Sequence, residues 1–145
     1  GQSYVVLSYG FTRDMDFHGY FSHEAKGVDQ YYYGLMHRII NNSWLDFSIG
    51  IGRRHRLEEI HIFFPEWLYT IKLPNNFFIG GSIVDIKNSE NNEYLGTTFD
   101  IAFFMPIDPF SDRFSEPVPV IYLAIGLFKP LSNVIYPTYS IDIKL

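Results

Sequence analysis

Large apolar residues alternate with smaller or polar residues along most of this chain, with the period of two that is typical of β-strands. Six segments show the alternation clearly: 5–11, 45–51, 67–73, 99–105, 121–127 and 139–145. Two further segments, 31–40 and 76–86, are rich in β-branched and aromatic residues, and glycines interrupt their alternation. The pattern therefore predicts an all-β chain of eight strands, with a single domain that covers residues 1–145.

One of the two weaker segments permits a second interpretation. In 31–40, "YYYGLMHRII", four apolar positions also fit the spacing of a short helix: Tyr32, Leu35, Met36 and Ile39. We expect a strand there, and the helix is the alternative.

The connections between the predicted strands favour an antiparallel arrangement. Asn41-Asn42 and Pro74-Asn75 are turn-forming pairs that suit tight hairpins. The remaining connections are longer: 12–30, 52–59, 87–93, 106–117 and 129–137. Long and short connections mostly alternate, so we expect an up-and-down sheet with tight turns at one end and longer loops at the other. The segment 106–117 departs from this rule, because it is long where a tight turn is expected.

The two faces of the predicted strands carry side chains of different size. Opposite the large apolar residues stand mostly Gly, Ala, Ser and Thr, together with a few charges: Asp46, Lys72, Asp100, Asp142 and Lys144. A strand face in contact with water usually carries long charged side chains, whereas small residues suit the crowded interior of a narrow closed barrel. The large apolar residues would then face outward, which is stable only in lipid. We therefore expect Tyr139, Ile141, Ile143 and Leu145 to face lipid and the small or charged residues to face the lumen.

In these features the chain resembles the small eight-stranded β-barrels of bacterial outer membranes, over nearly all of its 145 residues. That family typically ends on a strand of alternating apolar residues, and "YSIDIKL" at 139–145 is similar, with Leu145 where Phe is more usual. The resemblance implies an eight-stranded antiparallel up-and-down transmembrane β-barrel in the bacterial outer membrane, with both termini in the periplasm and a signal peptide already removed. It also implies aromatic girdles near the strand ends, formed by Tyr31, Trp44, Trp67, Phe77, Phe128 and Tyr136. The alternative is that these are ordinary core aromatics of a soluble β-protein.

Composition and charge exclude several other classes of protein. The net charge is −5 without a run of like charges, which disfavours a nucleic-acid partner. The chain contains no cysteine, so it has neither disulfides nor thiolate metal sites. Its longest apolar stretch, 118–128, is far shorter than the roughly 18 to 20 residues of a membrane-spanning helix.

A basic cluster in the second predicted loop is the candidate binding site. Arg53, Arg54, His55 and Arg56 are consecutive in an otherwise acidic chain. On an external loop they would lie beside the phosphates of lipopolysaccharide, which guanidinium groups bind through paired hydrogen bonds. The alternative is that they pair with Glu58 and Glu59 in a solvated hairpin tip.

The inward charges form a second candidate group. Asp46, Lys72, Asp142 and Lys144 all fall near the predicted tight-turn end, so we expect them to pair there as a charged plug, because buried charges are tolerated as hydrogen-bonded pairs.

The first predicted loop contains possible metal ligands, namely Asp14, Asp16, His18, His23 and Glu24. A polar surface loop with scattered acidic groups explains them as well, and we predict neither a metal nor a cofactor.

No arrangement typical of an enzyme stands out. Ser48 and Ser140 are inward strand serines without a histidine in register, and His37 and His61 are expected to be satisfied wall residues. The sequence therefore predicts a non-enzymatic outer-membrane barrel whose external loops bind lipopolysaccharide or a protein partner in the envelope.

Two alternatives from other functional classes stay open. One is a soluble antiparallel barrel or sandwich that acts as a binding module, either a ligand carrier or an immunity protein. The other is a lipid A-modifying acyl hydrolase or acyltransferase that would use His18, His23 or His55.

Overall fold

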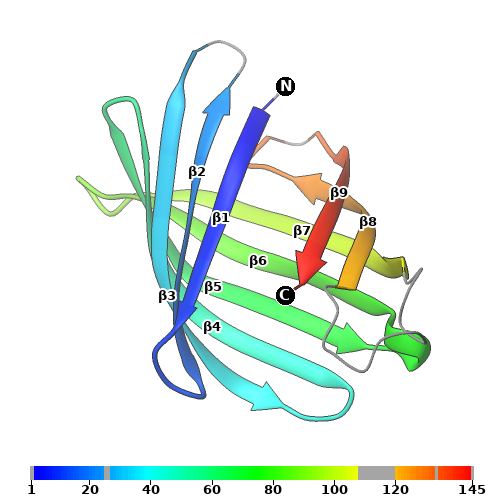
Figure 1. Cartoon of the computed structure of the whole chain (residues 1–145). Helices are drawn as coiled ribbons and strands as arrows, with labels where there is room; N and C mark the ends of the chain where they lie inside the picture. Colours follow the sequence, from blue (N-terminus) through cyan, green and yellow to red (C-terminus); the bar gives the residue numbers. More distant parts are fainter. Residues whose placement is uncertain (1, 25–26, 108–119, 133, 145) are drawn as a thin grey trace.

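The computed structural model describes residues 2–24, 27–107, 120–132 and 134–144. These residues form one antiparallel sheet in which every strand pairs with its neighbours along the chain (Figure 1). The strands are β1 (Gln2–Gly10), β2 (Met15–Glu24), β3 (Asp29–Asn41), β4 (Leu45–Arg56), β5 (Glu59–Lys72), β6 (Phe78–Asn88), β7 (Tyr94–Ile107), β8 (Val120–Lys129) and β9 (Tyr136–Lys144). A short 3-10 turn, η1 (Pro74–Asn76), joins β5 to β6. The all-β, antiparallel, up-and-down prediction is confirmed.

Within the described ranges the structure has nine strands rather than the predicted eight. The additional strand is β2, which occupies part of the segment 12–30 that was predicted to be a loop. Asp16 and His18 made this segment resemble a polar loop, but both lie on the same face of β2, and Phe17 and Phe21 lie on the other. Polar residues that face inward therefore hid the alternation.

The segment 31–40 is a strand and not a helix. It lies within β3, where exposed Tyr31, Tyr33 and Leu35 alternate with buried Tyr32 and Met36. The strand prediction is confirmed, because a period of two in burial excludes a helix.

The predicted loop 52–59 is also wrong. Residues 53–56 pair on one side with β3 and on the other with β5, so they belong to β4, and only residues 57 and 58 form the turn. Leu57 has the left-handed backbone conformation, with φ of 55°, that a two-residue hairpin turn requires. The run of basic residues lacks apolar alternation, which is why it resembled a loop.

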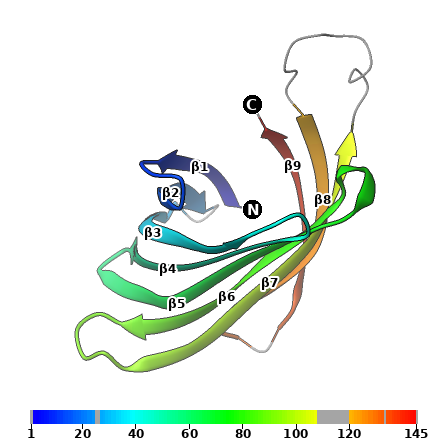
Figure 2. The same cartoon turned by 90° about the horizontal axis from the view of Figure 1, so that it is seen from below.

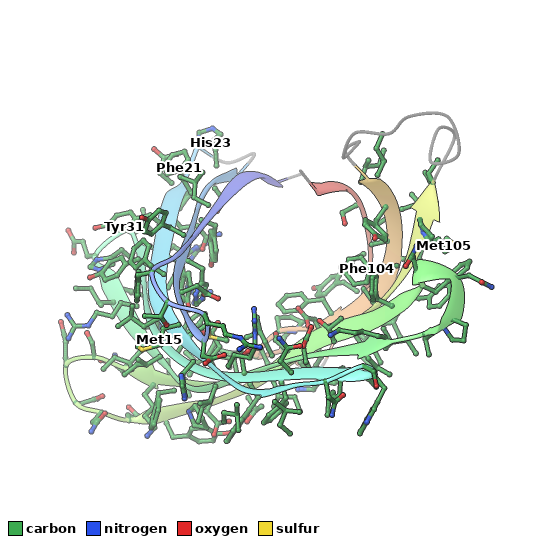
Figure 3. All side chains as sticks on the ribbon, turned by 60° about the horizontal axis from the view of Figure 1, so that its bottom comes forward. Met15, Phe21, His23, Tyr31, Phe104 and Met105 are labelled. Carbon is green, nitrogen blue, oxygen red and sulfur yellow. The ribbon has the colours of Figure 1, made fainter. Side chains whose placement is uncertain are left out.

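The sheet is strongly curved and has a hollow concave side, but it is not closed within the described residues (Figures 2 and 3). β1 and β9 are its two edges. β1 begins at the end of the sheet that holds the turns 57–58 and 89–93, which we call the Leu57 end. Because the number of described strands is odd, β9 finishes at the opposite end, beside η1, which we call the Pro74 end. The expectation that both termini lie at the same end is therefore wrong.

The register confirms the predicted difference between the two faces. Outward positions, on what we call the outer face, carry large apolar side chains that remain exposed; examples are Leu7 at 73 %, Ile125 at 56 % and Tyr139 at 86 %. Inward positions, on the inner face, carry the buried cluster of Tyr32, Phe63, Val84 and Ile86 together with many small residues. Figure 3 shows Phe21 and Tyr31 pointing away from the hollow and Phe104 pointing into it.

Candidate functional site

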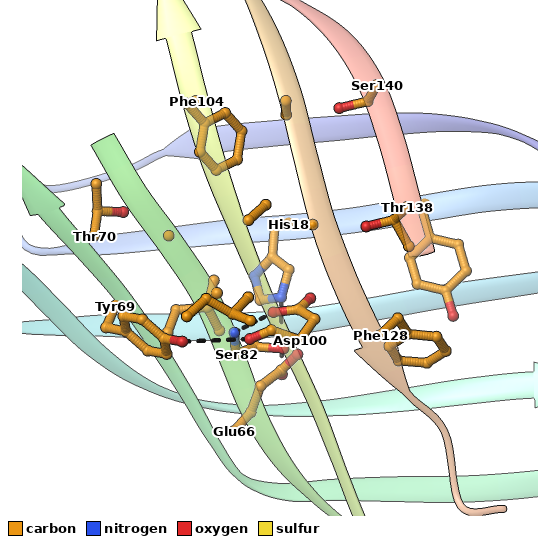
Figure 4. Close-up of a pocket in the computed structure, with 18 of the residues that line it drawn as sticks. His18, Glu66, Tyr69, Thr70, Ser82, Asp100, Phe104, Phe128, Thr138 and Ser140 are labelled. Carbon is orange, nitrogen blue, oxygen red and sulfur yellow. Dashed lines mark hydrogen bonds and ion pairs between the residues drawn. The ribbon is translucent and has the colours of Figure 1, made fainter. Parts of the chain in front are cut away.

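A pocket of about 620 Å³ lies on the inner face (Figure 4). Seven strands, β2, β3 and β5 to β9, contribute to its lining. Its walls are mainly aromatic and small side chains, and three titratable groups of particular interest project from different strands: His18 from β2, Glu66 from β5 and Asp100 from β7.

A bulge in β5 places Glu66 in this pocket. The register of β5 against both neighbours shifts between Phe63 and Glu66, so these two residues, three apart, both face inward. Upstream of the shift the odd-numbered residues face inward, and downstream the even-numbered residues do so. Residues 64 and 65 together occupy the place of one residue on each neighbour, so β5 has one additional residue here. If regular alternation continued from Phe63, Glu66 would lie on the apolar outer face and Trp67 would lie in the hollow.

Glu66 belongs to a hydrogen-bonded chain across three strands. Its side chain is almost fully buried, and its Oε2 accepts a hydrogen bond from the Tyr32 hydroxyl. That hydroxyl also lies 2.9 Å from Nε2 of His18. Because the hydroxyl has one hydrogen, which it gives to Glu66, it must accept from His18, so His18 carries a proton on Nε2. The carboxyl group of a buried glutamate is thereby supplied with a donor, as burial requires.

Glycines on β3 and β4 make room for Tyr32. A Cβ atom built on Gly52 would collide with the Tyr32 ring, and one built on Gly34 would collide with its hydroxyl. Tyr32 also packs against the Phe63 ring, with 5.4 Å between ring centroids. The orientation of the hydroxyl that holds Glu66 therefore depends on these two small residues.

The structure does not bring the four predicted basic residues together as one site. Arg53 and His55 lie on the outer face, where the His55 ring stacks on Tyr31 with centroids 4.5 Å apart. Arg54 and Arg56 lie on the inner face. Arg54 sits over the ring of Phe63, 5.2 Å from its centroid, so it is part of the inner wall and not of an external loop.

Two of the predicted lumen charges form an ion pair at the Pro74 end. Nζ of Lys72 lies 3.1 Å from Oδ2 of Asp46 and also donates to the backbone carbonyl of Asn42 at 2.9 Å. Asp100 lies in the pocket instead, where its Oδ1 accepts from the backbone N–H of Ser82.

The remaining two lumen charges lie in β9. The register places Asp142 and Lys144 opposite Tyr122 and Val120, and their side chains are outside the described residues. The plug that would join them to Asp46 and Lys72 stays a prediction.

The possible metal ligands of the first predicted loop are separated by the two faces of the sheet. Asp16 and His18 face inward, whereas His23 faces outward and lies 2.6 Å from Asp29. In the part of the chain that the structure describes, no group of three or more such residues could hold a metal ion. The side chain of Glu24 is outside that part.

Sequence reasoning missed the combination of His18, Tyr32 and Glu66, because it depends on the register of strands that are distant in the chain. One local signal was present in "FFPEWLYT", residues 63–70: a single carboxylate in an apolar strand, directly after a proline. A proline inside a strand marks a bulge or an edge, and a bulge changes which residues face inward. The same pocket also brings Ser140 and His18 into one lining, which alternation alone did not predict.

No protein-family model, curated protein or solved structure matches this chain. Within the described ranges, none of the helical segments has the length and apolar character needed to cross a membrane.

Proposed function

We propose that this chain is an integral protein of the bacterial outer membrane, with its outer face in lipid and its Leu57 end in contact with lipopolysaccharide. The observation that carries the proposal is the exposure of large apolar side chains at successive outward positions of the sheet. They include Leu7, Leu35, Ile51, Ile83, Phe103, Ile125, Leu127, Tyr139 and Ile141. An apolar surface of this extent is unstable in water and matches the hydrocarbon of a bilayer. A soluble binding module would bury this face and expose the polar one.

The outer face changes character towards the Leu57 end. Its outward positions there include Arg53, Asp85, Lys87 and Lys129, whereas the middle of the same strands carries Ile51, Ile83 and Ile125. Tyr31 and Tyr33 also face outward near this end. An apolar band bordered by aromatic and charged side chains is the arrangement of an outer-membrane protein at the level of the lipid headgroups.

The free edges of the sheet add a requirement to the proposal. In hydrocarbon the unpaired backbone groups of β1 and β9 would each cost several kcal/mol, so both edges must be paired in the membrane. We include in the proposal that the sheet closes into a barrel there. Because β1 and β9 run in the same direction, direct pairing between them would be parallel.

Cysteine labelling of two adjacent residues tests the lipid contact. Thr138 and Tyr139 are both exposed, face opposite sides of β9 and can each be replaced in a chain without native cysteine. In vesicles, a polarity-sensitive fluorophore on Tyr139→Cys is expected to emit as in hydrocarbon and to be quenched by lipids with brominated chains. The same fluorophore on Thr138→Cys is expected to escape quenching, because it points into the lumen.

Equal quenching at the two positions, or failure of the protein to enter vesicles, would contradict the lipid-facing assignment. Electrophoresis in SDS adds a separate readout of closure, since a closed barrel migrates as a compact species until it is boiled. A folded, vesicle-inserted protein without such a shift would retain the lipid contact but lose the closure.

The contact with lipopolysaccharide is tested by a matched pair of substitutions. Arg53→Gln is expected to weaken binding of purified lipopolysaccharide by about fivefold, because one cation near a phosphate-rich surface contributes about 1 kcal/mol. Arg13→Gln, at an exposed position of the turn at the Pro74 end, is expected to leave binding unchanged. Titration of the protein in detergent micelles measures both. Equal losses in the two variants would remove Arg53 from the proposed contact.

A further inference from the structure

We propose that the pocket on the inner face binds a primary amine carried on an aromatic or apolar body. This inference is independent of the membrane location proposed above, because it rests on the side chains that line the pocket. The volume of about 620 Å³ lies within the roughly 300–1,000 Å³ that is usual for sites of small ligands.

The charge of the lining selects a cation. Glu66 and Asp100 both line the pocket, while none of the described lining residues is lysine or arginine. Arg54 is outside the lining, and its guanidinium is engaged with the Phe63 ring, with the Tyr20 hydroxyl and with His61, 3.4 Å from its Nδ1. The pocket therefore presents two acceptor groups without a permanent positive charge among its described walls.

Both carboxyl groups have few donors among the described residues and retain acceptor capacity. Glu66 receives the Tyr32 hydroxyl on Oε2, and Nε2 of His18 lies 3.9 Å from the same oxygen. Asp100 receives the backbone N–H of Ser82 on Oδ1 and a hydrogen bond from the Ser82 side chain. A carboxylate has about four acceptor positions, so an ammonium group with three donors can add bonds to either one. Burial of a carboxylate is costly unless a cation or several donors compensate it, and a bound ammonium supplies both.

The two carboxyl groups lie close enough to act on one ligand. Glu66 is opposite Val84 on β6, and Asp100 is opposite Ser82 on the same strand, so the two acids are two strands and two residues apart on one face. From strand spacing and rise this corresponds to roughly 12 Å between their backbones, and their side chains extend into the space between. Figure 4 shows Glu66, Asp100 and His18 converging on one part of the pocket.

The rest of the lining suits an apolar body. Phe104 and Phe128 line the pocket on the side of β7 and β8, and Tyr20 and Tyr32 line it on the side of β2 and β3. Aromatic faces attract cations and also pack against rings, which favours an amine over an inorganic ion.

Calorimetric titration of the full chain in detergent micelles tests the proposal with two probes of the same shape. Phenethylamine is expected to bind saturably, and 2-phenylethanol, which has a hydroxyl in place of the ammonium, is expected to bind at least about tenfold more weakly. Glu66→Gln and Asp100→Asn are each expected to weaken phenethylamine by about tenfold, since each removes one charged acceptor. Asp85→Asn, on the outer face, is the matched control and is expected to bind as the unmodified chain does.

Two results would overturn the proposal: equal affinity for both probes, or unchanged affinity for phenethylamine in both pocket variants. Absence of saturable binding to the unmodified chain would also overturn it. If a carboxyl variant fails to fold, Thr138→Trp retains both acids and fills the pocket from an exposed position of its wall. That variant is expected to abolish binding, and full binding in it would place the probe elsewhere.

Discussion

Replacement of Gly52 with alanine is expected to lower the free energy of unfolding by about 2 to 3 kcal/mol, because the added methyl group overpacks the inner wall. The Cβ atom would occupy the space of the Tyr32 ring and lie against its hydroxyl. Tyr32 cannot move aside freely, since it packs on Phe63 and donates to Glu66. The substitution therefore displaces the donor that satisfies a buried carboxyl group. Urea titration of the protein folded in micelles measures the change.

Gly10→Ala is the matched control for this experiment. Gly10 is exposed, and a Cβ atom there would meet only the backbone oxygen of Thr12, at 3.8 Å. Its unfolding free energy is expected to change by no more than about 0.5 kcal/mol. A double variant, Gly52→Ala with Tyr32→Leu, is expected to lose less than the sum of the two single losses, because the smaller side chain accepts the methyl group. Strict additivity would show that Gly52 does not act through Tyr32.

The second large effect concerns the outer face. Ile83→Arg is expected to destabilise the inserted protein by about 2 to 4 kcal/mol, which is the cost of a guanidinium near the bilayer midplane. Ile83 lies midway along β6, exposed between Trp67 and Phe99 of the neighbouring strands. Folding into lipid vesicles at increasing urea concentration, followed by electrophoresis, measures the loss.

The same substitution nearer the Leu57 end provides the comparison. Tyr94 is exposed at the beginning of β7, and Tyr94→Arg is expected to cost only about 0 to 1 kcal/mol, because its side chain reaches the headgroups. Ile83→Leu is expected to be neutral. If arginine costs the same small amount at both positions, the outer face is in contact with water and the membrane proposal fails.

The alternation of side-chain size predicted most of this sheet, because most strands carry small side chains on the inner face and large apolar side chains on the outer face. Small residues such as Gly80 and Gly126 lie inward, as expected, and Ile79 and Ile125 lie outward. The prediction failed where inward positions carry large polar residues, as in β2, since alternation then loses its contrast in hydropathy. It failed again at 53–56, where the strand continues beyond the apolar band and both faces are polar.

The pocket could not be predicted from the sequence for a different reason. His18, Tyr32 and Glu66 belong to three strands, and their approach depends on the register of β2 against β3 and on the shift within β5. Register is set by the whole set of pairings and not by any one strand. The Asp46 and Lys72 pair was easier to foresee, because both residues lie beside tight turns at the same end of the sheet.

The register shift in β5 also constrains how this strand can change in length during evolution. Removal of one residue at 64 or 65 would straighten the strand and leave Glu66 to Lys72 on their present faces, because residues 64 and 65 together occupy the place of one residue on each neighbouring strand. Removal of both would exchange the faces downstream, so that the carboxylate of Glu66 and the ammonium of Lys72 entered the apolar side while Trp67 and Ile71 filled the hollow. At this point of the strand, loss of one residue is therefore expected to be tolerated and loss of two to be selected against.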